Sequence, residues 1–276
     1  MKVSFNQPAF VPWGGFFARL MSSDKMVLLD ETILARGFTY VNRNRIKGPE
    51  GEVWITVPLK RKGRGQQKIK DLEIHEKERW AKKFLLTLKH YYGKSIYFEP
   101  VFADIRAAME GPGENFLPLA LALLDILKRG FGIETEMILQ SHVGIAGQGT
   151  ALLVSIAKEL GAEEVILPYF SEKAVDCSRF RDENIRVKLL RYLPPQYPQF
   201  WGDFLMNLSA LDLIFCCGRD GRTVIEKGMR FYGSHEKTAH KHQGQMGIYQ
   251  PMQRTLAPRI LRSLISSNAL FTSSSA

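Results

Sequence analysis

The segment Gln7–Phe17 is the densest group of residues in this chain that could do chemistry. It reads Gln-Pro-Ala-Phe-Val-Pro-Trp-Gly-Gly-Phe-Phe and lies between a β-like run and a helical apolar pattern. A loop that leaves a strand and opens a helix presents free backbone N–H groups, and the helix dipole there favours an anion. Gly14 and Gly15 would let a phosphate approach the backbone, and Trp13 offers a stacking face. The alternative is a packed turn in which Trp13 and Phe16 fill the core.

The basic stretch Asn42–Lys47 is a second candidate for binding an anion. It has the sequence Asn-Arg-Asn-Arg-Ile-Lys. Arginine side chains grip phosphate or carboxylate with two parallel hydrogen bonds, and asparagine amides add neutral hydrogen bonds. A solvated basic loop is the alternative, and it is the interpretation we favour for the later basic stretch Lys60–Lys70, which lacks such amides.

Acidic residues flank the second predicted strand. Asp24 precedes this strand, and Asp30 and Glu31 follow it. Carboxylates at the end of a sheet strand can bind Mg²⁺ or orient a ribose or an amine. Helix capping and plain surface exposure are the alternatives for each of these acids.

Aromatic and polar residues meet again near the end of the patterned region. Tyr197–Gly202 is an aromatic loop that contains Gln199, and it is followed by Leu208–Leu213 with Ser209 and Asp212. Such a loop could hold a sugar or a base. Packing together with helix capping by the serine is the alternative.

Lysines and histidines elsewhere give weaker signals. Lys82 and Lys83 lie on a predicted helix, where a solvated face is the usual role. His235, His240 and His242 are close in sequence, but no neighbouring residues complete a metal site, so we predict no metal there.

Strands and helices must alternate to position these residues. Lys2–Asn6, the helical pattern within Phe10–Met21 and Lys25–Leu29 predict a βαβ opening of the kind found in Rossmann-like sheets. Asn42–Pro49 is polar and ends in Gly-Pro, which indicates a loop, and Lys60–Lys70 is expected to be a mobile one. Further strands are predicted at Val53–Leu59, Leu72–Ile74, Glu136–Ser141, Val165–Pro168 and Ile185–Tyr192, and helices at Lys77–Tyr92, Phe116–Arg129 and Gly149–Leu160. The pattern predicts an α/β fold with a parallel or mixed sheet covered by helices.

The pattern changes after Gly218. We expect one α/β domain over residues 1–218 and a basic, polar extension over 219–276 that forms a flexible, partly disordered tail. Hydrophobic residues make up 45% of the 276, enough for a sizeable core, and no run is long enough to span a membrane. The three cysteines have no spacing typical of a disulfide framework, and polar residues and prolines interrupt the N-terminal apolar run, which is therefore unlike a signal peptide. Both features predict a soluble cytoplasmic protein. A net charge of +10 predicts an anionic partner.

These motifs together resemble the bacterial WbqC-like family. The resemblance spans roughly residues 1–218 and rests on the following residues: Gln7-Pro8, Pro12-Trp13, Gly15-Phe16, Asp24, Asp30, Asn42 to Gly48, Thr56 to Pro58, Lys68-Ile69, Trp80, Lys82-Lys83, Gly161-Ala162, Tyr197 to Gln199, Leu208-Ser209 and Leu211 to Leu213. The chain departs from the family pattern at Phe84, where histidine is common, at Leu167-Pro168 in place of Ser-Gly, and at Cys216-Cys217 in place of Asn-Glu.

The family is associated with surface-polysaccharide (O-antigen) loci. The resemblance implies an enzyme that modifies an amino sugar, by forming an amide between an acyl or aminoacyl group and the sugar amine. The opening unit is also loosely similar to nucleotidylyltransferase-like ligases, so ATP or another nucleotide with Mg²⁺ is a candidate cofactor and a nucleotide sugar a candidate partner. The alternative is a scaffold protein in which the departures at Phe84, Leu167-Pro168 and Cys216-Cys217 mark a lost active site.

We expect the following roles under the enzyme hypothesis. Gln7, Asp24, Asp30 and Arg43 are the candidate catalytic residues, with either aspartate as base or Mg²⁺ ligand. The candidate binding residues are Trp13, Gly14, Gly15, Asn42, Asn44, Arg45, Lys47, Lys82, Lys83, Tyr197, Gln199, Ser209 and Asp212. The rival hypothesis is an RNA-binding protein that uses the cations between Arg36 and Lys94, although no recognition motif is present.

Overall fold

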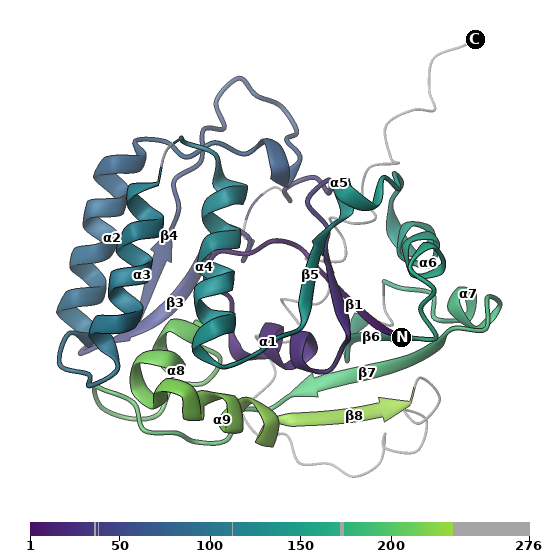
Figure 1. The fold of residues 1–276 in the computed structure, drawn as a ribbon. Coiled ribbons are helices and arrows are strands. Elements are labelled where there is room, and N and C mark those ends of the chain that lie inside the picture. The colour runs from purple at the N-terminus through teal and green to yellow at the C-terminus, as the bar shows by residue number, and fades with distance from the viewer. Residues whose placement is uncertain (36, 38, 112, 172–173, 234–276) are drawn as a thin grey trace.

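A mostly parallel sheet forms the centre of the protein (Figure 1). The computed structural model describes residues 1–233 except 36, 38, 112 and 172–173. The six strands have the order β5-β2-β1-β6-β7-β8, and only β8 runs antiparallel to its neighbour. Their bounds are β5 Glu136–Leu139, β2 Lys25–Leu28, β1 Lys2–Asn6, β6 Glu164–Pro168, β7 Arg186–Tyr192 and β8 Met229–Gly233. The predicted α/β class with a parallel or mixed sheet is confirmed.

The opening unit is the predicted βαβ motif. Strand β1 leads through the loop of residues 7–13 into α1 (Gly14–Met21), and β2 then pairs in parallel with β1. The chain builds outward from β1 to β2 and β5 on one side, and later to β6, β7 and β8 on the other. The direction of winding therefore reverses between β1 and β6. In open α/β sheets, ligands bind beyond the carboxyl ends of the strands at such a switch point.

A helical layer with a β-hairpin lies to one side of the sheet. The hairpin consists of β3 (Arg43–Gly48) and β4 (Gly51–Thr56), so the prediction of a loop over Asn42–Pro49 is wrong. Helices α2 (Lys77–Tyr92), α3 (Phe98–Glu110) and α4 (Phe116–Gly130) pack side by side against it (Figure 1). The strand predicted at Leu72–Ile74 is replaced by a 3₁₀ turn at Ile69–Asp71 and isolated bridges.

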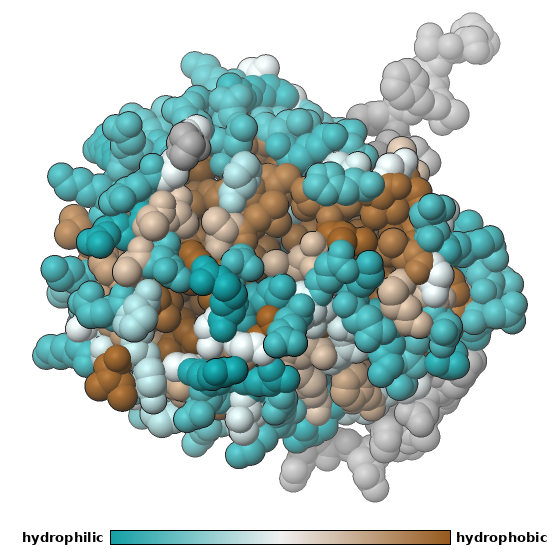
Figure 2. Space-filling model, in the orientation of Figure 1, coloured by the Kyte–Doolittle hydropathy of each residue, from teal (hydrophilic) through white to brown (hydrophobic). Residues whose placement is uncertain are grey.

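The two faces of the sheet carry separate apolar clusters. Alternate residues of β1 show this, because Val3 and Phe5 pack against α6 (Gly149–Glu159) and α7 (Ser178–Arg181), whereas Ser4 faces α1. The α1 face joins the helical layer in one large core. The edge strand β5 is only partly covered, and Figure 2 shows apolar side chains reaching the surface in the middle of the view, between α4 and the short helix α5 (Gln140–Val143). None of the described helices has the length and apolar character needed to cross a membrane.

The folded part continues past the boundary expected at residue 218. After α8 (Ala210–Cys217) and a 3₁₀ turn at Gly218–Asp220, helix α9 (Gly221–Lys227) packs against α1, and β8 pairs along the whole of β7. The sequence analysis missed β8 because its composition is partly polar. An edge strand pairs with a single neighbouring strand and tolerates exposed polar side chains. Residues 234–276, including the three histidines considered above, lie outside the described residues.

The basic loop of residues 60–70 is tied to the fold by ion pairs. Arg64 pairs with Glu73 at 2.6 Å, and Lys60 contacts both Glu73 and Glu114. Lys68 and Lys70 pair with Glu31. These pairs occupy several of the cations on which an RNA-binding hypothesis would depend.

Candidate functional site

A small pocket opens at the carboxyl end of β1. It is lined by the last strand residue, the following loop, α1 and the segment before β3: Asn6, Gln7, Ala9, Pro12, Trp13, Phe16, Arg19, Tyr40, Val41 and Asn44. The cavity has a volume of about 40 Å³. One water needs roughly 10–15 Å³ on this scale, so the cavity has room for a few waters or for one carboxylate- or phosphate-sized group. Only the end of a larger ligand could enter it.

Arg19 is the cation of this pocket, and it lacks a counter-ion in the described part of the chain. Its side chain is 6% exposed. Among the described residues its guanidinium makes a single hydrogen bond, in which Nη2 donates to Asn6 Oδ1 at 2.7 Å, and its Nε is buried without a partner. Burial lowers the pKa of Arg19 to about 10, which still leaves it charged at neutral pH. Buried charges are normally paired, so Arg19 is the residue of this pocket best suited to bind an anion.

The loop before α1 is held in a strained conformation. Val11 has a φ of 37°, an uncommon value for a β-branched residue. Its carbonyl oxygen accepts hydrogen bonds from Asn44 Nδ2 at 2.8 Å and from Ser209 Oγ at 2.7 Å, and the carbonyl of Pro12 accepts from the Ala210 amide. Segments far apart in the sequence therefore fix this loop. Strain of this kind persists only where the surroundings impose it, and it is concentrated at functional sites.

The predicted loop residues surround the pocket in different ways. Gln7 lines it, is nearly buried and donates from Nε2 to Thr32 Oγ1 at 2.9 Å. Trp13 also lines it and packs edge-on against Tyr192. A Cβ on Gly14 would lie 2.6 Å from the Tyr192 hydroxyl, and one on Gly15 would lie 2.4 Å from the Trp13 ring. Both glycines thus allow close packing of aromatic rings around the start of α1.

The basic hairpin divides its residues between two faces. Asn42 and Asn44 are buried toward the loop, where Asn42 Nδ2 donates to the Val57 carbonyl. Arg43 and Arg45 alternate with them and therefore project from the other face of β3. Arg45 pairs with Glu52 and lies 5.7 Å from the centre of the Trp54 ring. Of this stretch, only Asn44 lines the pocket.

Lys47, Tyr197, Gln199 and Asp212 form a buried network with Tyr92. Asp212 is fully buried, and its Oδ1 accepts from the Tyr92 hydroxyl at 2.8 Å. Its Oδ2 accepts from the Tyr197 hydroxyl at 2.8 Å and from Gln199 Nε2 at 3.0 Å. The Lys47 ammonium donates to Gln199 Oε1 and to two backbone carbonyls. Desolvation raises the pKa of Asp212 despite these donors and raises that of Tyr92 still further from its ordinary value.

Ser209 connects this network to the pocket loop. Its hydroxyl accepts from the Leu211 amide as the N-cap of α8, which the sequence offered as one interpretation, and donates to the Val11 carbonyl. Asp212 lies one turn further along the same helix. The network therefore contacts the candidate pocket through α8 and the loop, and its own polar atoms are engaged within the protein.

The two candidate aspartates lie beyond opposite ends of strand β2. Asp24 is exposed at the start of β2, where its carboxylate accepts from the Lys2 amide at 2.7 Å. Asp30 is buried beyond the carboxyl end of β2, and its two oxygens accept from the amide and hydroxyl of Ser141. The structure thus places Asp24 at the amino end of β2 and Asp30 beyond its carboxyl end, and neither aspartate lines the pocket.

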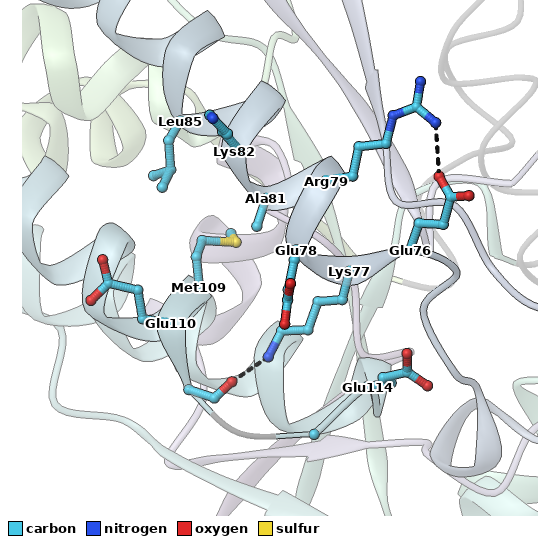
Figure 3. Close-up of a pocket in the computed structure, with 12 residues that line it drawn as sticks. Glu76, Lys77, Glu78, Arg79, Ala81, Lys82, Leu85, Met109, Glu110 and Glu114 are labelled. Carbon is cyan, nitrogen blue, oxygen red and sulfur yellow. Dashed lines mark hydrogen bonds and ion pairs between the residues drawn. The ribbon is translucent and has the colours of Figure 1, made fainter.

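Lys82 and Lys83 lie on the exposed side of α2, away from β1. Lys82 borders a larger hollow of about 820 Å³ between the start of α2 and the end of α3 (Figure 3). Figure 3 shows acids and bases of both helices around an apolar floor of Ala81, Leu85 and Met109. The hollow mixes both signs of charge. Among the described residues, no group of three or more histidine, cysteine or acidic side chains could hold a metal ion.

Positions that depart from the expected family pattern have apolar surroundings. Phe84 is buried and stacks on Trp80 with ring centres 5.5 Å apart, so it fills core space. Leu167 belongs to the apolar cluster beneath α6. Burial raises the pKa of the Cys217 thiol to about 11 and that of Cys216 still further, so neither is an activated nucleophile.

Arg19, Asn6 and Tyr40 are pocket residues that the sequence analysis did not single out. A single arginine in the otherwise apolar helix Gly-Gly-Phe-Phe-Ala-Arg-Leu-Met was the available signal for the first of them. A charged residue on the buried face of a helix requires a partner.

The comparisons with known proteins agree with the resemblance noted from the motifs. A model of the WbqC-like protein family matches residues 7–224. An uncharacterized protein of Mycobacterium tuberculosis, Rv1507c, is 31% identical over 222 residues, which cover 79% of this chain and 95% of that relative. The family match includes the pocket loop, α1, the hairpin and the Asp212 network. The chain belongs to the WbqC-like protein family.

Proposed function

We propose that this protein is an enzyme that binds the anionic end of a small substrate beside Arg19 and transfers an acyl or aminoacyl group to a sugar amine. The observation that carries the proposal is the buried Arg19 guanidinium, which makes one hydrogen bond and has no carboxylate partner among the described residues. Retaining such a charge costs stability, and a ligand anion would offset that cost.

The size of the pocket limits which part of the substrate enters. A carboxylate or a phosphate matches its volume of about 40 Å³, whereas a whole nucleotide sugar does not. The remainder of the substrate would lie across Trp13 and Tyr40, which are partly exposed at the pocket. The association of the family with polysaccharide loci favours an amino sugar as the acceptor.

The proposed reaction replaces the bond between the acyl carbon and its leaving group with a C–N bond and releases one amine proton. The amine nitrogen attacks the acyl carbon, the C–N bond forms, and the leaving group departs with the electron pair of its bond to that carbon. The amine proton passes to solvent. Arg19 would stabilise the negative charge that develops on the acyl oxygen or the leaving group, and Gln7 and Trp13 would orient the reacting end. We move the catalytic cation from Arg43 to Arg19, because Arg43 projects from the opposite face of β3 from Asn44.

The remaining candidates receive supporting roles in this proposal. Asn44 and Ser209 hold the strained loop, since both donate to the Val11 carbonyl. Asp30 holds the β2–β5 edge through Ser141. An ATP-dependent ligase would use the same pocket for the carboxylate. The carboxylate oxygen would take a phosphoryl or adenylyl group from ATP, with release of ADP or pyrophosphate, and that group would leave as phosphate or AMP when the amine attacks.

A ligand screen with matched variants tests the proposal. Thermal shifts would be measured for the wild type, Arg19→Gln and the exposed-helix control Arg106→Gln with amino acids, short carboxylates, nucleotides and amino-sugar nucleotides, and with a short RNA. We expect at least one anionic small molecule to raise the Tm of the wild type and of Arg106→Gln but not of Arg19→Gln. Mass spectrometry of that ligand with an amino sugar, with and without ATP and Mg²⁺, should then reveal the amide. Stabilisation that survives Arg19→Gln, or that RNA alone provides, would refute the proposal.

A further inference from the structure

Two further arginines that lack an acidic partner among the described residues meet at the carboxyl end of β7. Arg191 stands directly opposite Arg230 in the antiparallel register of β7 and β8, two strands that run side by side in Figure 1. Directly opposed side chains of this kind have Cβ atoms about 5 Å apart, and like charges there destabilise the pair of strands. The register thus places two arginine side chains next to each other on one face of the sheet, where like-charge repulsion opposes the arrangement.

Neither arginine is neutralised within the described residues. The Arg191 side chain lies over the Tyr169 ring, with Cζ 5.5 Å from its centre, and makes no hydrogen bond or ion pair there; its Nε is buried without a partner. Among the described residues, Arg230 makes hydrogen bonds through Nη1 alone, which donates to the carbonyls of Lys227 and Met229. Several N–H donors of both side chains therefore remain available to a ligand.

This arginine pair is separate from the Arg19 pocket. Tyr192, the next residue along β7, packs against Gly14 on the α1 face of the sheet. Because successive strand residues point to opposite faces, Arg191 lies on the other face. Tyr169 follows β6 directly, so the group sits at the carboxyl end of a strand that borders the switch point.

Aromatic side chains stand beside the cations. The Tyr169 ring centre lies 4.7 Å from that of Tyr232 and 5.0 Å from that of Phe170, and all three residues are only partly buried. Paired guanidinium groups suit the several oxygens of a phosphoryl group, which they can bind through parallel hydrogen bonds. We propose that Arg191 and Arg230, next to Tyr169, form a binding site for a phosphoryl group, carried by free phosphate or by a nucleotide.

Titration of the full chain with two probes tests this site. Inorganic phosphate and uridine diphosphate would each be titrated calorimetrically into the wild type, Arg191→Gln, Arg230→Gln, Arg191→Lys, Arg19→Gln and Arg106→Gln, after circular dichroism has shown that each variant is folded. We expect Arg191→Gln and Arg230→Gln each to weaken binding at this site about tenfold or more, Arg191→Lys to weaken it less, and Arg106→Gln to change it less than about twofold. The Arg19 pocket also fits a phosphate, so Arg19→Gln should remove at most a separate binding event and leave the affinity of this site within about twofold.

The two probes distinguish the sources of the phosphoryl group. Equal affinities would assign the site to phosphate itself, and tighter binding of the diphosphate would add a contribution from the nucleoside; both results support the site. The inference fails if neither probe binds, or if Arg106→Gln weakens binding as much as Arg191→Gln, which would indicate a response to net charge. It also fails if the loss follows Arg19→Gln instead. Since the Arg19 pocket and this site have their own variants, failure of one proposal leaves the other standing.

Discussion

Buried polar side chains of this protein differ in whether the chain itself satisfies them. Asp212 accepts three side-chain hydrogen bonds and lies in the field of Lys47, whereas Arg19 makes a single hydrogen bond and has no acid beside it among the described residues. The first arrangement is typical of a structural network and the second of a site that receives a charged ligand. This contrast is why the candidate site is centred on the pocket and not on the more extensive network.

The Tyr92 hydroxyl should prove structural. It donates to Asp212 Oδ1 and accepts from the Lys47 amide at 3.0 Å. Tyr92→Phe leaves both buried groups short of a partner, so we expect the free energy of unfolding in urea to fall by about 2 kcal/mol. Tyr91→Phe, whose hydroxyl makes no hydrogen bond to the described residues, is the matched control and should stay within about 0.5 kcal/mol of the wild type. Equal effects of the two variants would contradict the structural role.

At the scale of elements, ion pairs fasten the loop of residues 60–70 to the segment around Glu73. Two basic partners, Arg64 and Lys60, lower the pKa of Glu73 to about 2. A carboxylate with a lowered folded-state pKa adds stability at pH values above its unfolded pKa, and this stability is lost as the pH falls toward the folded value.

Glu73→Gln should remove part of the acid sensitivity of the fold. Melting curves between about pH 5 and pH 2 should show a smaller decrease in Tm with falling pH for Glu73→Gln than for the wild type. Glu78→Gln, an exposed glutamate on α2, should retain the wild-type slope. An unchanged slope in Glu73→Gln would mean that these pairs do not persist in solution.

The sequence predicted elements well where local periodicity decides the structure. Lys2–Asn6 and Lys77–Tyr92 have the predicted bounds, because the strand alternates apolar Val3 and Phe5 with polar residues and the helix has a regular apolar face. Strand β3 (Arg43–Gly48) was missed because the buried amides of Asn42 and Asn44 are satisfied by distant carbonyls, which no local pattern reveals. Helix α3 was missed as well, and its early proline is tolerated because the first turn needs no N–H there.

The candidate site was predictable only in part for the same reason. Gln7, Trp13 and Asn44 do line one pocket, since a loop after the first strand of an α/β sheet lies at its carboxyl edge. Arg19 is notable because it is buried and the described part of the fold places no acidic side chain beside it. That absence is a property of the packed structure and cannot be read from the composition of the helix.

For the whole molecule, the net charge of +10 is less informative than the location of individual cations. Many basic side chains are paired with acids, including Lys60, Arg64 and Lys70. Exposed cations such as Lys82, Lys83 and Arg106 also lack an acidic partner among the described residues, whereas Arg19 lacks one although it is buried. This burial is the reason for proposing a small anion that enters the pocket and not a polyanion bound at the surface.

The most direct test of the central claim is the free energy of unfolding of Arg19→Met in urea, without ligand, beside the wild type and Arg106→Met. Methionine fills similar space without a charge. If Arg19 is an uncompensated buried cation kept for a ligand, Arg19→Met should equal the wild type or exceed it by about 1 kcal/mol, with Arg106→Met unchanged. A loss of about 2 kcal/mol or more in Arg19→Met alone would show that the charge stabilises the fold, and would contradict the assignment of this pocket to an anion.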